Sequence, residues 1–258
     1  MKRNIARTFC TAAAVLCLAA ALAFGWGLFK REMEYRQGQE GIEEIYRAMD
    51  QAAGAAREET GAAEEENVRL KQYEALHQMN PHMAGWIRID GTRVDYPVMY
   101  TPQDPEFYFH RDFYGKDSAY GMIFVDGDCR MDGSDPNLLI YGHHMRDGSM
   151  FAQIEDYQRE DFWKEHPIIH FDTLTELGTY EVAGAFKRPA GELDEAFKAM
   201  LLAGTQEDYC ALWDLLKESG FYDTGVEAVS GRRLITLTTC EYTQGDGRFF
   251  LVAQETGE

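Results

Sequence analysis

The C-terminal part of the chain reads LITLTTCEYTQGDGRFFLVAQ over residues 234–254. Two runs rich in β-branched, leucine and aromatic residues, Leu234–Thr239 and Phe249–Gln254, flank a glycine-containing turn, so the stretch predicts two neighbouring strands. Cys240 closes the first strand and Arg248 begins the second. If the strands pair, these residues face each other across the turn, where a guanidinium can stabilise a thiolate or an oxyanion. Taken alone, the two residues also fit a buried structural cysteine beside a surface arginine.

Similar short apolar runs, bounded by turn residues, recur upstream and are typical of buried strands. They are Trp86–Ile89 and Val94–Met99, which form a predicted hairpin, then Met122–Val125, Leu138–Tyr141, Ile168–Phe171 and Tyr180–Phe186. Helices are predicted at 68–78, 149–157 with a continuation to 164, 193–202 and 206–218. Many short strands with local helices predict a mainly β fold with peripheral helices, and a closed barrel rather than a doubly wound sheet.

The composition places the chain among globular proteins and excludes two other classes. Of the 258 residues, 45% are hydrophobic and 27% are charged, which rules out disorder of the whole chain. The formal net charge is −19, and a chain this acidic is repelled by phosphate backbones. We therefore expect no nucleic-acid partner.

An uncharged stretch of 22 residues, 8–29, lies between basic clusters near the N-terminus. As a helix it would span about 33 Å, which matches a bilayer core of about 30 Å. A signal peptide cleaved after Ala21-Leu22-Ala23 is the alternative. However, the apolar run continues to Phe29 and ends in Lys30-Arg31, as a retained anchor does. We expect a single-pass anchor in the cell membrane with a cytoplasmic N-terminus and an extracellular domain, because basic flanks stay inside.

The predicted organisation therefore has four parts. Residues 1–7 form a cytoplasmic N-terminus and residues 8–29 a transmembrane signal-anchor. Residues 30–69 form a stalk or linker, because they are rich in Ala and Glu and low in hydrophobic residues. Residues 70–258 form the globular domain.

Three cysteines lie outside the apolar segment, namely Cys129, Cys210 and Cys240. An odd number in an exported domain leaves at least one thiol unpaired, and catalysis is one reason to retain a free thiol. His143 and His144 follow a predicted strand and a glycine, where the backbone can expose a side chain. By themselves these histidines fit either a metal site or a plain surface turn.

Taken together, these segments resemble the motifs of sortases, the cysteine transpeptidases of Gram-positive cell surfaces. Residues 137–145, NLLIYGHHM, with 147–151, DGSMF, are similar to the histidine motif, and TLTTC at 236–240 is similar to the TLxTC motif. Arg248 stands where the family has its arginine. The extended histidine motif is closest to class B. The resemblance runs from about Leu70 to the C-terminus and implies a sortase-like closed β-barrel, preceded here by the membrane anchor and helical stalk.

The resemblance also implies three catalytic roles. Cys240 is the nucleophile that attacks the carbonyl of a Thr in a sorting signal. His143 is the general acid that protonates the leaving amine, and Arg248 holds the substrate carbonyl or the oxyanion. The family often has an acidic residue two positions after the cysteine, where this chain has Tyr242. Any helper role of that carboxylate is therefore absent or taken elsewhere.

Further residues match the substrate groove of class B, namely Tyr141, Thr238 and Glu241. Residues 190–225 correspond to a helical insertion that shapes the groove. The implied function is transpeptidation: exported proteins are cleaved at a C-terminal sorting signal through a thioacyl intermediate on Cys240. They are then transferred to an amine of the cell wall or of its lipid-linked peptidoglycan precursor. Two alternatives stay open: a thiol peptidase that hydrolyses the intermediate, and a non-catalytic surface-binding ectodomain.

Neither a cofactor nor a metal is expected, because the other polar motifs suit ligands poorly. His166 and His170 are four residues apart, but Pro167 opposes a helix and a strand would space these ligands badly. The acidic segment 126–135 lacks the spacing of a calcium loop, and we interpret it as a solvated loop. No role is assigned to Cys129, Cys210, His77 or His110.

Overall fold

The fold of the chain is seen in a computed structural model that describes residues 2–60, 65–241 and 247–257. For residues 2–16, 31, 34, 37, 58–60, 240 and 241 this description covers the backbone alone. Residues 45–258 form one compact unit and residues 1–44 another.

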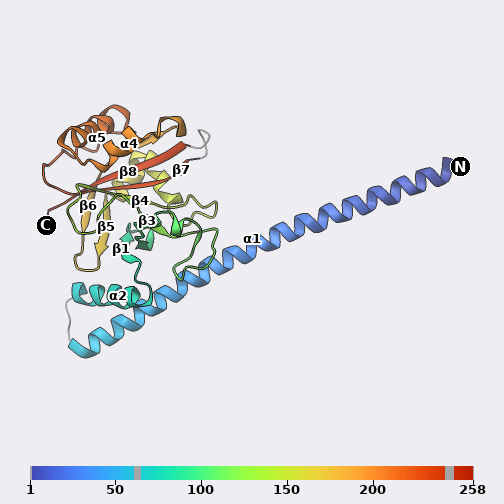
Figure 1. The fold of residues 1–258 in the computed structure, drawn as a ribbon, viewed down its shortest axis with the longest axis horizontal. Helices are drawn as coiled ribbons and strands as arrows, with labels where there is room; N and C mark the ends of the chain where they lie inside the picture. Colours follow the sequence, from blue (N-terminus) through green and yellow to red (C-terminus); the bar gives the residue numbers. More distant parts are fainter. Residues whose placement is uncertain (1, 61–64, 242–246, 258) are drawn as a thin grey trace. The chain divides into compact units, whose positions relative to one another are not determined.

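Strands of the compact unit close into a barrel with the order β1-β2-β3-β4-β7-β8-β6-β5 (Figure 1). The pairs β2–β3 and β4–β7 are parallel, and the other neighbours are antiparallel. The predicted closed barrel is thereby confirmed. Its strands are β1 (Met83–Arg88), β2 (Asp95–Met99), β3 (Ile123–Val125), β4 (Asn137–Tyr141), β5 (Ile168–Thr173), β6 (Thr179–Arg188), β7 (Leu234–Glu241) and β8 (Gly247–Glu255).

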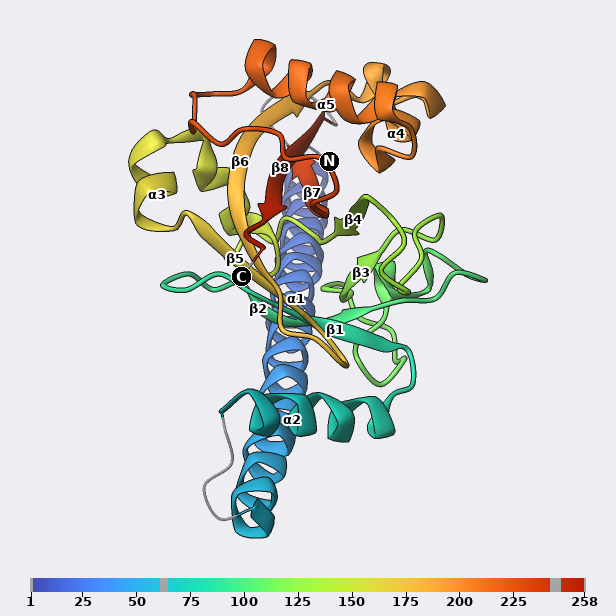
Figure 2. The same ribbon diagram turned by 90° about the vertical axis from the view of Figure 1, so that its left-hand side faces the viewer.

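Helices α4 and α5 pack against each other on the outside of the barrel, α4 beside β4 and α5 beside β6 (Figure 2). Both have side-chain N-caps: Asp194 accepts a hydrogen bond from the Phe197 amide, and Thr205 accepts one from the Asp208 amide. The α-helices are α1 (Lys2–Thr60), α2 (Glu65–Met79), α3 (Glu160–Glu165), α4 (Glu195–Leu202) and α5 (Gln206–Ser219). Short 3₁₀ helices are η1 (Phe107–His110), η2 (Ala152–Gln158) and η3 (Ala190–Glu192).

The predicted helix at 149–164 is in fact divided into η2 and α3. Met150, just before η2, has a φ of 55°, which a continuous right-handed helix does not allow. Arg159 between the two helices is extended, with φ −102° and ψ 125°. The apolar spacing of this segment is therefore that of two short helices, each of which packs its own buried side chains, Ile154 and Tyr157 in η2 and Phe162 in α3.

The barrel core consists of side chains that point inward from each strand and exclude water. Ile87, Val98, Ile140, Leu237 and Leu251 are among those with no exposed surface. Burial of such side chains supplies most of the folding free energy, at about 1.5–3 kcal/mol each. The barrel is thus a packed scaffold on whose strand ends a site can be held rigidly.

The end of α1 and all of α2 belong to the compact unit, although the end of α1 and the first residues of α2, 65–69, fall within the predicted stalk. Ala53 and Ala56 of α1 form a buried cluster with Val68 of α2. The Tyr73 hydroxyl of α2 donates to Asp172 Oδ2 of β5 at 2.7 Å. In the described part of the chain, no helix is both long and apolar enough to cross a bilayer. The predicted division into cytoplasmic end, anchor, stalk and catalytic domain stays a prediction.

Candidate active site

The hairpin of β7 and β8 pairs Cys240 directly with Arg248 in its antiparallel register. The predicted pairing of these two strands is therefore correct. On the other side of β7, the parallel strand β4 pairs Tyr141 with Thr238. Three adjacent strands thus bring Tyr141, Thr238, Cys240 and Arg248 to one end of the barrel. The side chains of Cys240 and Glu241 lie outside the described residues, as does Tyr242.

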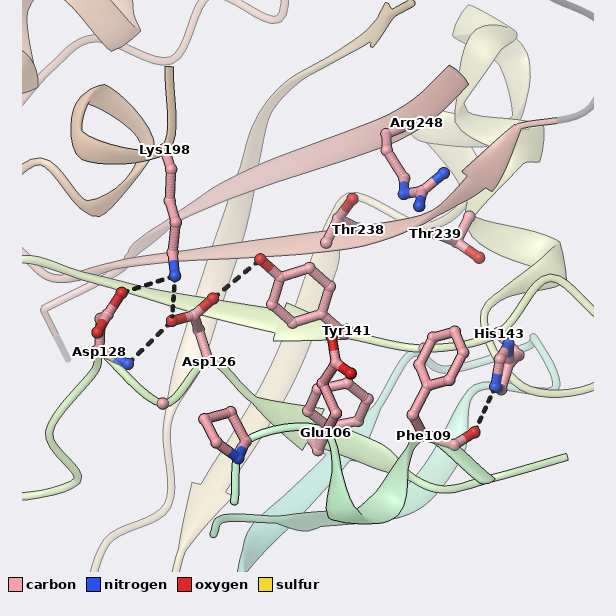
Figure 3. A pocket seen from close by; sticks show the side chains of 14 residues that line it. Glu106, Phe109, Asp126, Asp128, Tyr141, His143, Lys198, Thr238, Thr239 and Arg248 are labelled. Atoms are coloured by element: carbon pink, nitrogen blue, oxygen red, sulfur yellow. Dashed lines mark hydrogen bonds and ion pairs between the residues drawn. The ribbon is translucent and has the colours of Figure 1, made fainter. Parts of the chain in front are cut away.

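An open pocket of about 380 Å³ lies at this end of the barrel (Figure 3). Four predicted site residues line it, namely Tyr141, His143, Thr238 and Arg248. The other lining residues are Pro105, Glu106, Phe109, Phe124, Asp126, Gly127, Asp128, Gly142, Lys198 and Thr239. A concave, partly apolar surface with a few convergent polar groups is the usual form of a binding site.

His143 follows β4 by two residues, and its position depends on Gly142, which directly follows the strand and packs tightly against two side chains. A Cβ atom at Gly142 would lie 2.5 Å from side-chain atoms of Ile123 and Phe151. The backbone carbonyl of His143 accepts a hydrogen bond from the Phe151 amide at 2.9 Å, which fixes the turn after the strand. The side chain of His143 is therefore presented by a rigid strand end.

Two residues of η1, Phe109 and His110, contact the ring of His143. Its Nε2 lies 2.6 Å from the Phe109 carbonyl oxygen, which only accepts, so Nε2 carries the proton. The Phe109 ring lies 4.4 Å from the His143 ring, and the His110 ring stacks on it at 5.8 Å. Burial lowers the pKa of His143, the bond to the Phe109 carbonyl opposes this, and the charge of His110 lowers the pKa further. Sequence reasoning missed both Phe109 and His110.

His144 is turned away from the pocket. Its Nδ1 lies 3.2 Å from Glu155 Oε2, and Glu155 Oε1 is 2.9 Å from Lys187 Nζ. All three side chains are mostly buried. The two neighbouring histidines thus have different surroundings, and only His143 lines the pocket.

Arg248 extends from β8 into the pocket (Figure 3). Its Nη1 donates to the Gly247 carbonyl at 3.1 Å. Two hydroxyls lie near it on β7: the Oγ1 atoms of Thr238 and Thr239 are buried and have no hydrogen-bond partner among the described atoms. A buried hydroxyl without a partner costs free energy, and both threonines belong to the wall of the pocket. Thr239 was missed, although it stands next to Cys240 in the sequence.

The acidic loop after β3 differs from its prediction. Asp126 is only 6% exposed, and its carboxylate contacts Lys198 Nζ at 2.9 Å and the Tyr141 hydroxyl at 2.9 Å. The interpretation as a solvated loop is therefore wrong for Asp126. Asp128 and Asp135 pair with Lys198 and Arg130, respectively. No group of three or more potential metal-binding side chains occurs in the part of the chain that the structure describes.

The remaining predicted positions lie outside the pocket. Cys129 is buried and has no disulfide; burial raises the pKa of its thiol to about 12, so it stays protonated. Cys210 is free and exposed. His166 and His170 both lie beside Asp90, whose carbonyl oxygen is 2.8 Å from His166 Nδ1. These residues belong to the scaffold.

Comparisons with known proteins agree with this geometry. The sortase domain family matches residues 87–256 of the chain. Sortase B of Staphylococcus aureus is 26% identical over 252 residues, covering 96% of this chain and 97% of that protein. Sortase B of Listeria monocytogenes is 31% identical over 172 residues, covering 64% and 65% of the two chains.

Solved structures give the same result. A substrate complex of Staphylococcus aureus sortase B superposes with a TM-score of 0.70 and 26% identity, covering 86% of this chain and 98% of that one. Sortase B of Clostridium perfringens superposes with a TM-score of 0.64 and 29% identity, covering 70% and 98%. The chain therefore belongs to the sortase family and is a cysteine transpeptidase of class B.

Proposed function

We propose that this sortase cleaves the C-terminal sorting signal of exported proteins and transfers them to an amine of the cell wall or of its lipid-linked precursor. Cys240, His143 and Arg248 carry the reaction in this proposal. The observation that supports it best is the register of β7 and β8, which opposes Cys240 and Arg248 beside the pocket that His143 lines. A thiol, a proton donor and an oxyanion donor are what thiol-based acyl transfer needs.

In the first step, the Cys240 thiolate attacks the carbonyl carbon of the Thr before the scissile bond. The carbonyl oxygen becomes an oxyanion, and the guanidinium of Arg248 donates to it. A charge-assisted bond of this kind is stronger than a neutral one and is directed by the planar group. Collapse of the tetrahedral intermediate restores the carbonyl and breaks the peptide bond, which leaves a thioester on Cys240.

The leaving amine must gain a proton as the peptide bond breaks. His143, held at the strand end by Gly142 and by the Phe109 carbonyl, is the proposed donor. In the second step an acceptor amine attacks the thioester and loses a proton to the neutral His143. The peptide is then joined to the acceptor and the thiolate is released. One solved structure of a sortase B is a complex with triglycine, which supports an amine of this kind as acceptor.

Tyr141, Thr238 and Glu241 are proposed to bind the substrate. Tyr141 and Thr238 line the pocket on adjacent strands. Glu241 follows Cys240 at the end of β7, so its position in the chain, and not its side chain, supports this assignment.

Replacement of Cys240 by Ala tests the proposal. We expect Cys240→Ala to lose cleavage of a quenched fluorescent peptide library in which Thr is fixed before the scissile bond. Cys129→Ala and Cys210→Ser should keep most of the activity, since neither thiol lines the pocket. Turnover by Cys240→Ala would overturn the role of this thiol. Added triglycine distinguishes transfer from hydrolysis: a peptide–triglycine product shows transfer, and free acid alone favours the hydrolytic alternative.

We further propose that residues 8–29 anchor the enzyme in the cell membrane, with the N-terminus in the cytoplasm and the catalytic domain outside. The basic residues Lys2, Arg3 and Arg7 before an uncharged stretch of 22 residues support this orientation. Protease added to intact protoplasts should then digest the catalytic domain. Protection of this domain would contradict the topology.

A further inference from the structure

The end of the pocket away from His143 is built around an ion pair that the reaction itself does not use. Lys198 of α4 is the only described lining residue that comes from the connection between β6 and β7. Its Nζ lies 2.9 Å from Asp126 Oδ1 and 2.6 Å from Asp128 Oδ2. The helical insertion therefore reaches the pocket through a single side chain that is tied to the barrel (Figure 3).

Asp126 is the centre of this arrangement. Its carboxylate accepts hydrogen bonds from the Tyr141 hydroxyl at 2.9 Å and from the Asp128 amide at 2.9 Å, besides its contact with Lys198. The residue is almost fully buried. A buried carboxylate is tolerated only when it is paired and hydrogen-bonded, so Tyr141, Asp128 and Lys198 are held in place together.

Tyr141 is the aromatic member of this network and lines the pocket together with Asp126, Asp128 and Lys198. Its ring stacks on Phe124 with centroids 5.4 Å apart, and its hydroxyl is bound by Asp126. Burial and the negative charge of Asp126 raise the pKa of Tyr141, so the hydroxyl remains a donor. Both the ring plane and the hydroxyl are thus fixed, and Tyr141 precedes His143 by two residues on the end of β4.

We propose that Asp126 and Lys198 are positioning residues for peptide binding, and that they act through Tyr141. This inference rests on the proposed function of the pocket. The leaving amine lies at His143 and the oxyanion at Arg248, so the acyl part of the peptide extends over Tyr141 toward Lys198. Without the ion pair, the Tyr141 ring and α4 lose their fixed positions at this part of the pocket. Binding of the acyl part then weakens, while the chemistry at Cys240 is unchanged.

Steady-state cleavage by Asp126→Asn and Lys198→Met tests the inference, with the best-cleaved peptide of the Thr-fixed library as probe. We expect KM to rise roughly tenfold in each, because loss of one charge-assisted hydrogen bond typically has an effect of this size. The value of kcat should stay within about twofold. The double variant should resemble the single ones, because the two groups act as a unit. Lys198→Arg, which keeps the charge, should restore much of the affinity.

Two comparisons separate this role from a general loss of stability. Arg130→Met removes the Arg130–Asp135 pair of the same loop, outside the pocket, and should leave KM unchanged. In a Tyr141→Phe background, Asp126→Asn should raise KM by less than about twofold, since the hydroxyl that it orients is gone. The inference would be overturned if Asp126→Asn raised KM equally in the wild-type and Tyr141→Phe backgrounds. A fall in kcat at constant KM would overturn it as well. An inactive wild-type chain would instead overturn the proposed function.

Discussion

Cys240 on β7 and Arg248 on β8 are direct partners in the antiparallel register of the C-terminal hairpin. Because side chains alternate along a strand, a shift of the register by one residue would place Arg248 opposite a neighbour of Cys240 and on the other face. Both strands are paired on their outer edges as well, β7 with β4 and β8 with β6. The register that the local hairpin sets for the two residues is therefore held from both outer edges as well.

Replacement of Arg248 tests the oxyanion role. Loss of one oxyanion donor typically lowers kcat about 10²–10³-fold, and we expect a loss of this size in Arg248→Ala. Arg248→Lys keeps the charge but lacks the planar pair of donors, so it should recover only part of the rate. Arg159→Ala, at an exposed arginine, is the matched control. Peptide cleavage at saturating substrate measures these effects, and a normal rate in Arg248→Ala would remove this arginine from the mechanism.

The two neighbouring histidines are expected to differ strongly. General acid catalysis typically contributes about 10²–10⁴-fold, so His143→Ala should be nearly inactive. His144→Ala loses its contact with Glu155 at 3.2 Å but no group that lines the pocket, and we expect a mild effect. Cleavage and triglycine-transfer assays on both variants decide between them. The reverse order of activities would show that His144 is the acid.

The pH profile should show the effect of burial on His143. The active form has a Cys240 thiolate and a protonated His143, and an ordinary thiol has a pKa of about 8.5. Burial holds the pKa of His143 below 6.5, and so below that of an ordinary thiol. The fraction of enzyme in the active form then rises with pH up to the pKa of His143 and is constant from there to the pKa of the thiol. The acid limb of kcat/KM therefore ends at the pKa of His143, below pH 6.5. His110→Gln removes a neighbouring positive charge, which should raise the pKa of His143 and move the acid limb upward. His170→Gln, beside Asp90, is the control and should leave the acid limb in place. An acid limb at the same pH in His110→Gln and in the wild type would contradict the effect of the His110 charge on His143.

Gly142 is expected to be required for packing. A Cβ atom there would lie 2.5 Å from Ile123 and Phe151 side-chain atoms, and both side chains are fully buried. Overpacking of this kind typically costs about 1–3 kcal/mol, so Gly142→Ala should lower the free energy of unfolding by about this amount. Gly191→Ala is the matched control, because nothing lies within 4 Å of its Cβ position. Denaturant unfolding measures both, and equal stability of the two variants would contradict the prediction.

The sequence by itself determined the local parts of the site. The hairpin around Cys240 and Arg248 follows from two β-rich runs and a short turn, so their opposition needed only local rules. His143 was placed at a strand end for the same reason. The barrel as a whole was predicted because the chain has many short strands with local helices, and the resemblance to sortases implied the same fold.

Only the tertiary structure decided what surrounds these groups. The carbonyl that holds His143 comes from Phe109, 34 residues earlier, and Lys198 meets Asp128 across 70 residues. Neither contact has a periodicity or a spacing that a sequence reveals, because each depends on how separate elements pack against the barrel. Asp126 shows the consequence: an acidic loop composition indicates solvent exposure, while the ion pair with Lys198 of a distant helix and the hydrogen bond from Tyr141 offset the cost of burying the carboxylate.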